Sequence, residues 1–107
     1  MDIEKTLSPD NPQLATLYFC RLQDKLSTDL DQETIILDLE SGIYSQLNSV
    51  ASTIWKLLER PVSFEDIVNE VVSTYDVTEA SCKDEIISFL ADLAENRLIS
   101  IANEAPA

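Results

Sequence analysis

Few side chains in this chain are of a type that carries out chemistry. It has two cysteines, Cys20 and Cys82, and no histidine, which removes the commonest general base and the commonest metal ligand. A zinc site would need both cysteines together with carboxylates, although they lie far apart in the sequence. Ser63 and Ser81 have no base partner, so neither is expected to act as a nucleophile. We therefore expect no catalytic residue, no metal and no cofactor, and two free, packed thiols.

The charge balance restricts the possible partners. The chain carries 20 acidic and 7 basic side chains over 107 residues, a formal net charge of −13. Nucleic-acid binders supply Lys and Arg to neutralise phosphates, so this excess of acidic side chains disfavours nucleic acid as a partner. An anionic membrane would repel the protein for the same reason. The surface is either a solvated acidic one that aids solubility, or it steers a partner with basic segments. With no apolar run of membrane-spanning length and no secretory signal, we expect a cytoplasmic protein.

The length and composition predict one domain with an irregular segment at each end. At this length, with 45% apolar residues, we expect one domain with one modest core. Residues 1–13 are polar and contain two prolines, so they are expected to form a flexible N-terminal arm, and 102–107 a frayed tail.

The first half of the chain predicts strands, with a polar turn over 27–32. Strands are predicted, from β-branched and aromatic content, at 14–20, 34–39 and 43–47.

The second half predicts helices, because after residue 47 the apolar residues recur with a helical period. Asn48, Ser63 and Thr78 each precede such a stripe and are suited to cap a helix N-terminus. Asn96 can take the left-handed conformation that ends the third helix. We expect an α+β fold over residues 14–101, in which a small three-stranded antiparallel sheet is followed by a three-helix bundle in a winged-helix-like arrangement.

The third predicted helix has a second apolar face. At about 100° per residue, one wedge holds the core stripe, which includes Phe89, and the flank beside it is apolar where a solvated helix would carry charge. This Ile87 flank comprises Ile87, Ala91 and Ala94, with Ala80 and the stem of Lys83. Two interpretations stay open: the flank packs under the sheet or the N-terminal arm, or it forms a groove with strand 43–47. If that strand is a sheet edge, an extended peptide could pair with it.

An ordered set of residues along the chain carries a family resemblance. The set is Leu37-Asp38, Gly42-x-Tyr44-x-x-Leu47-Asn48, Ile54-Trp55-x-Leu57-Leu58, Phe64-x-x-Ile67-Val68, Tyr75-Asp76-Val77, Asp84-x-x-x-x-Phe89-Leu90-x-x-Leu93 and Leu98-Ile99. Together, over roughly residues 34–101, these resemble the PqqD-like family, whose archetype is the pyrroloquinoline quinone biosynthesis protein D. The sequence departs from the family pattern at Asn96-Arg97, where a glycine is frequent, and at Ser45, where an aromatic residue is frequent.

The resemblance implies a non-catalytic adaptor that binds the leader segment of a ribosomally synthesised precursor peptide, as in lasso-peptide biosynthesis. The leader would lie as an added β-strand between strand 43–47 and the last helix. The complex would be presented to a modifying enzyme such as a radical SAM enzyme or a leader peptidase. The implied peptide contacts are Ile43, Tyr44, Ser45, Gln46, Leu47, Lys83, Asp84, Ile87, Ser88 and Ala91.

Two questions stay open within this interpretation. Asp84 and Glu85 lie near the N-terminus of the last helix. Either they are acidic because the helix dipole favours acids there, or Asp84 contacts a basic residue of the leader. The alternative function is a structural or self-associating winged-helix interaction module. We expect a monomer or a weak dimer, without nucleic acid or membrane as a partner.

Overall fold

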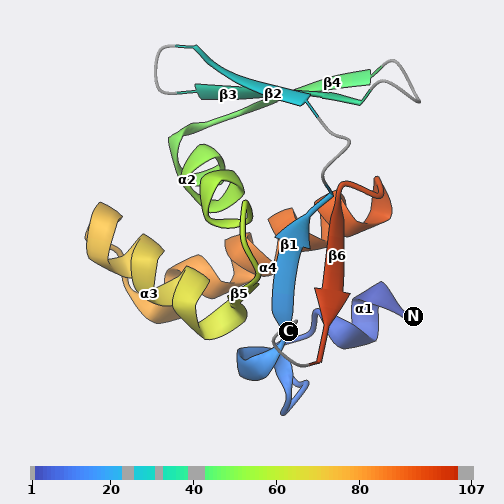
Figure 1. The fold of residues 1–107 in the computed structure, drawn as a ribbon. Coiled ribbons are helices and arrows are strands. Elements are labelled where there is room, and N and C mark those ends of the chain that lie inside the picture. The colour runs from blue at the N-terminus through green and yellow to red at the C-terminus, as the bar shows by residue number, and fades with distance from the viewer. Residues whose placement is uncertain (1, 23–25, 31–32, 39–42, 104–107) are drawn as a thin grey trace.

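The computed structural model describes residues 2–22, 26–30, 33–38 and 43–103. Within these ranges the chain forms two small antiparallel sheets and a bundle of three longer helices (Figure 1). The elements are α1 (Ile3–Thr6), the 3-10 turn η1 (Leu14–Thr16), β1 (Tyr18–Arg21), β2 (Leu26–Leu30), β3 (Glu33–Asp38), β4 (Ile43–Leu47), α2 (Ser49–Leu57), β5 (Val62–Ser63), α3 (Phe64–Tyr75), α4 (Glu79–Glu95) and β6 (Ile99–Ala102).

The two sheets join different parts of the chain. One has the strand order β2-β3-β4, with Ile36 opposite Ser45 and Thr34 opposite Leu47. The other has the order β5-β1-β6, so β1 pairs with strands from the middle and the end of the chain. Figure 1 shows the β2-β3-β4 sheet at one end of the molecule, next to α2, and the second sheet beside the helix bundle.

Two predictions about the strands are wrong. The segment 27–32 is predicted to be a turn, whereas Leu26–Leu30 forms β2 and pairs with β3. Because β2 is an edge strand of its sheet, it needs little apolar sequence, and its polar residues are those typical of a turn. The strand predicted at 14–20 begins at Tyr18 and belongs to the second sheet, where it pairs with the apolar C-terminal segment as β6.

The predicted helix starts are confirmed. The side chains of Asn48, Ser63 and Thr78 each accept a hydrogen bond from the backbone N–H three residues later. The residue with left-handed backbone at the end of α4 is Arg97, with φ of 59°, and not Asn96 as predicted. Asn96 is the C-cap and donates from its side-chain amide to a carbonyl of the last helical turn, so the left-handed position falls one residue later.

The core lies where the three helices meet the β5-β1-β6 sheet. Trp55 and Phe19 are at most 1% exposed, as are Leu58 and Leu90, which confirms the prediction of Trp55 as a core residue. The Arg21 guanidinium lies 5.2 Å from the centre of the Trp55 ring, so its charge also stabilises the edge of the core. In the described ranges, no helix is long and apolar enough to cross a membrane.

The N-terminal segment is not the loose arm that its composition predicts. Asp2 caps the short helix α1, and Leu7, 4% exposed, belongs to the same apolar cluster as the helix bundle. Within residues 2–13 Leu7 alone is buried, so the segment has no apolar period from which its packing could be predicted. The predicted frayed tail begins inside β6, and residues 104–107 lie outside the described ranges.

Candidate functional site

Strand β4 is an edge of its sheet in the part of the chain that the structure describes, because the strand order is β2-β3-β4. An edge strand presents backbone N–H and C=O groups to a further extended segment. The edge position of this strand is what the groove interpretation of the sequence requires. Residues 46 and 47 have described side chains: Gln46 is exposed, and Leu47, 7% exposed, is a core residue. The side chains of residues 43–45 lie outside the described set.

A buried hydroxyl links β3 and β4 to α2. Ser52 in α2 is 2% exposed, and its Oγ accepts a hydrogen bond from the Thr34 N–H at 2.8 Å. The same hydroxyl donates to the Leu47 carbonyl at 3.2 Å. Since Thr34 and Leu47 are paired residues of β3 and β4, this buried hydroxyl ties the end of the ladder to α2. This bond adds to the packing of Ile36 and Leu47 in the core, which also holds the sheet against the helices.

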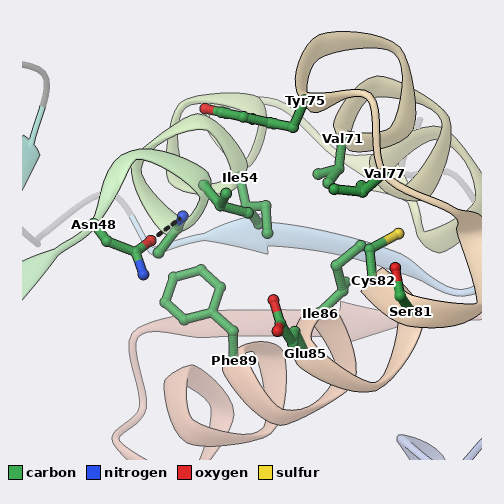
Figure 2. A pocket seen from close by; sticks show the side chains of 12 residues that line it. Asn48, Ile54, Val71, Tyr75, Val77, Ser81, Cys82, Glu85, Ile86 and Phe89 are labelled. Atoms are coloured by element: carbon green, nitrogen blue, oxygen red, sulfur yellow. Dashed lines mark hydrogen bonds between the residues drawn. The ribbon is translucent and has the colours of Figure 1, made fainter.

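A pocket of about 250 Å³ opens where the end of β4 passes into α2. We call it the β4-end pocket, and its walls come from α2, the end of α3 and the first half of α4. Figure 2 shows Asn48 and Phe89 at one end and Val77, Ser81 and Cys82 at the other. The lining residues are Asn48, Val50, Ala51, Ile54, Val71, Tyr75, Val77, Ser81, Cys82, Glu85, Ile86 and Phe89.

The β4-end pocket is mostly apolar, and its rim is open to solvent. Val77, 38% exposed, is the large hydrophobic side chain that the described part of the chain leaves exposed, and it lies on this rim. Glu85 is the one charged residue among the twelve that line the pocket, all of them within the described ranges. The pocket therefore combines an apolar surface with a single negative charge.

The wall between α2 and α3 is held in place by hydrogen bonds. The Tyr75 hydroxyl at the end of α3 donates to the Ser49 carbonyl at 2.9 Å, and it also pairs with the Thr53 hydroxyl. Both partners lie in α2, so the tyrosine clamps the two helices at the mouth of the pocket. A wall fixed in this way needs little rearrangement when it receives a ligand, which lowers the entropic cost of binding.

The cysteine in the pocket is a packing residue. Cys82 is 5% exposed, and burial raises the pKa of its thiol above the ordinary value of 9.0, an effect that the carboxylates of Glu79 and Glu85 increase. At neutral pH the thiol is therefore protonated and weakly nucleophilic. The prediction of free thiols is confirmed, since neither Cys20 nor Cys82 is in a disulfide. Among the described residues, no group of His, Cys, Asp or Glu is arranged to hold a metal ion.

The structure separates the two faces of α4. Lys83 and Ile87 line a second hollow, whose other wall is formed by the N-terminal segment, including Pro9 and Pro12. These two residues of the Ile87 flank thus face that segment, in agreement with the first of the two interpretations of the sequence. Half-buried Ala91 packs against the core cluster, as does Ile87.

The face of α4 that borders the β4-end pocket is the other one, which carries Glu85 and Phe89. Asp84 and Ser88 are exposed and lie outside both hollows. The sequence pattern predicts Phe89 in the core stripe and gives Glu85 no binding role. The available signal was the position of Phe89 at the border of the stripe, where the structure leaves its ring only half-buried.

Residues 33–99, more than half of the chain, match the family model described as Coenzyme PQQ synthesis protein D (PqqD). The chain belongs to the PqqD family. No curated protein matches the sequence. The resemblance and the α+β, winged-helix-like fold predicted for this PqqD-family chain are therefore confirmed.

Three solved structures resemble this PqqD-family chain. TbiB1 in complex with the TbiA(beta) leader peptide is 31% identical, with a TM-score of 0.70, over 76% of this chain and 94% of that one. Lasso peptide synthetase B1 complexed with the leader peptide is 26% identical, with a TM-score of 0.66, over 77% and 96%. The PqqD truncation of Methylobacterium extorquens PqqCD is 20% identical, with a TM-score of 0.65, over 78% and 88%, and shares the fold.

Proposed function

We propose that this PqqD-family chain is an adaptor that binds the leader segment of a ribosomally synthesised precursor peptide. The observation that carries the proposal is the position of an edge strand, β4, beside an open apolar pocket. The leader peptides in the two more similar structures support it. The adaptor presents the bound leader to a modifying enzyme, for which a radical SAM enzyme and a leader peptidase are the two candidates.

The two parts of the site have different tasks. A leader that pairs with β4 gains backbone hydrogen bonds that depend little on its sequence, so β4 supplies affinity. The β4-end pocket receives a side chain of the leader next to the paired segment and supplies selectivity. The Ser52 hydroxyl fixes β4 on α2, and α2 forms one wall of the pocket, so backbone pairing and side-chain selection act on the same stretch of leader.

In this proposal the leader contacts positions 43–47 through their backbone, and Glu85 and Phe89 through the pocket. Asp84 and Ser88 are exposed on α4 outside the β4-end pocket, and we assign them to contact with the receiving enzyme. The Ile87 flank is assigned to contact with the N-terminal segment. The pocket binds and orients a peptide but offers no activated nucleophile, because the Cys82 thiol is protonated at neutral pH. The chemistry is therefore assigned to the partner enzyme.

The test is an amide-resolved NMR titration of the full chain with a synthetic leader, taken from a short precursor gene encoded beside this one. Shifts at residues 43–51 and 81–89, with little change over residues 2–17, are expected. A scrambled leader of the same composition is the control, because it keeps the charge but loses the order of side chains. Absence of shifts with the native leader, or equal shifts with the scrambled one, contradicts the proposal.

Self-association is the alternative, because an edge strand can also pair with a second copy of itself. Sedimentation of the chain alone and with the leader distinguishes the two functions. A leader-binding monomer keeps its mass apart from the added peptide. A self-associating module forms a dimer that persists at low micromolar concentration and resists the leader.

A further inference from the structure

The charge in the β4-end pocket lacks a partner within the described part of the chain. Glu85 is exposed at the pocket, and no described basic side chain forms an ion pair with it. On α4 its neighbours at a spacing of four residues are Ser81 and Phe89, neither of which is basic. Glu79, by contrast, pairs with Lys83 at 3.1 Å. A carboxylate at the edge of an apolar pocket, without a cation of its own, is complementary to a cation on the ligand.

The geometry of α4 matches that of an extended peptide. Residues four apart on a helix are separated by about 6 Å along its axis, because the rise is about 1.5 Å per residue. Residues two apart on an extended strand lie about 6.7 Å from each other and point to the same side. A peptide segment that lies along α4 with one apolar side chain against Phe89 therefore places its second-next side chain beside Glu85.

We infer that the β4-end pocket selects leaders in which a Lys or Arg lies two residues from an apolar anchor. The inference rests on the proposed function and specifies its ligand class. The anchor fills the apolar part of the pocket beside Phe89, and the cation pairs with the Glu85 carboxylate. The net charge of −13 acts in the same direction, since it raises the rate at which a basic leader meets the site.

The experiment compares Glu85→Gln with Asp84→Asn in the full chain, by calorimetric titration with the same synthetic leader. The two variants lose the same charge at adjacent, exposed positions of α4, but Glu85 lines the pocket and Asp84 does not. Glu85→Gln is expected to weaken binding by about three- to five-fold and to reduce its salt dependence, as for an exposed ion pair. Asp84→Asn is expected to leave the affinity within about 1.5-fold.

A scan of the leader locates the cation. Each Lys and Arg of the leader is replaced in turn by Gln. One replacement, two residues from an apolar position, is expected to weaken binding to the wild-type chain as much as Glu85→Gln does. The same replacement is expected to cause no further loss of affinity when the chain already carries Glu85→Gln. A leader with Glu at that position is expected to regain affinity for Glu85→Lys. Equal affinities of Glu85→Gln and Asp84→Asn, or a native leader without this basic residue, overturn the inference while leader binding itself stands. Absence of binding by all chains overturns the proposed function, and the inference with it.

Discussion

The two faces of α4 differ in what lies across from them. On the Ile87 flank, Lys83 and Ile87 face the N-terminal segment, which is held by the buried Leu7. On the opposite face, Glu85 and Phe89 border a pocket that the rest of the described chain leaves open. Both faces contain apolar side chains, so hydrophobicity does not separate them. What separates them is a segment about 80 residues away in sequence, which lies across the second hollow from the Ile87 flank and does not reach the β4-end pocket.

The largest expected effect comes from loosening the N-terminal segment that lies across from the Ile87 flank. Leu7→Ala removes the buried anchor of the N-terminal segment and is expected to lower the free energy of unfolding by about 2–4 kcal/mol. Leader affinity, measured on the folded fraction, is expected to change less than two-fold, because the segment lies away from the β4-end pocket.

Urea denaturation measures the stability, with Glu4→Ala, at an exposed position of α1, as the control for a substitution in the same segment. A loss below about 1 kcal/mol shows that the segment is not anchored by Leu7. A large loss of affinity in the folded protein would show that the two faces of α4 are not independent.

The second prediction compares a substitution on one face of α4 with a substitution on the other. Phe89→Ala removes the ring at the end of the β4-end pocket and is expected to weaken leader binding ten-fold or more, through lost apolar contact. Ile87→Ala, only two residues away, is expected to lower the stability by about 1–2 kcal/mol and to leave the affinity within about two-fold.

Both variants are measured by calorimetric titration and by urea denaturation, so that a loss of folded protein is not taken for a loss of affinity. Should Ile87→Ala reduce the affinity more than Phe89→Ala, the leader lies on the Ile87 flank, as the resemblance implied from the sequence. The pocket beside Phe89 would then have a different role.

The local parts of this structure could be predicted from the sequence, and the long-range parts could not. Asn48, Ser63 and Thr78 identify the three helix starts, because a capping side chain bonds a backbone group only three residues away. The pairing of β1 with β6 joins Cys20 to Ser100, and no local pattern specifies such a partner. The prediction therefore placed β1 in the wrong sheet.

The candidate site divides in the same way. The sequence pattern predicts a strand at 43–47, and β4 has these bounds. Its position at the sheet edge is only a condition of the groove interpretation, and the strand order β2-β3-β4 meets that condition. The helical wheel also gives the angle between the two faces of α4, but it does not tell which neighbour each face meets. That depends on Leu7 and the segment around it, in which a single buried residue produces no period.

The third prediction tests whether β4 and the pocket act together. Ser52→Ala removes the buried hydroxyl that bonds the Thr34 N–H and the Leu47 carbonyl, and is expected to cost about 1–2 kcal/mol of stability. Leader affinity is expected to fall a few-fold, because the sheet edge loses its fixed position on α2. Ser100→Ala is the control, since its exposed hydroxyl bonds the Cys20 carbonyl in the other sheet and lies outside the β4-end pocket.

NMR of the free Ser52→Ala variant checks the cause of any loss. Shifts are expected over β3, β4 and the start of α2, with the Ile87 flank unchanged. An affinity equal to that of the wild type would show that the edge strand and the pocket bind the leader independently of this tie.

The smallest effect is expected at the end of α4, beyond both faces. Arg97 has φ of 59°, and the backbone around it forms the paired bonds of a Schellman turn: Leu98 N–H to Leu93 C=O at 2.9 Å and Arg97 N–H to Ala94 C=O at 3.1 Å. Because a left-handed backbone costs a side-chain-bearing residue more than glycine, Arg97→Gly is expected to raise the stability by about 0.5–1 kcal/mol. Leader affinity is expected to stay constant, since the turn lies outside the β4-end pocket. A lower stability would mean that the arginine side chain contributes more than its backbone strain costs, and a changed affinity would mean that the end of α4 is coupled to its open face.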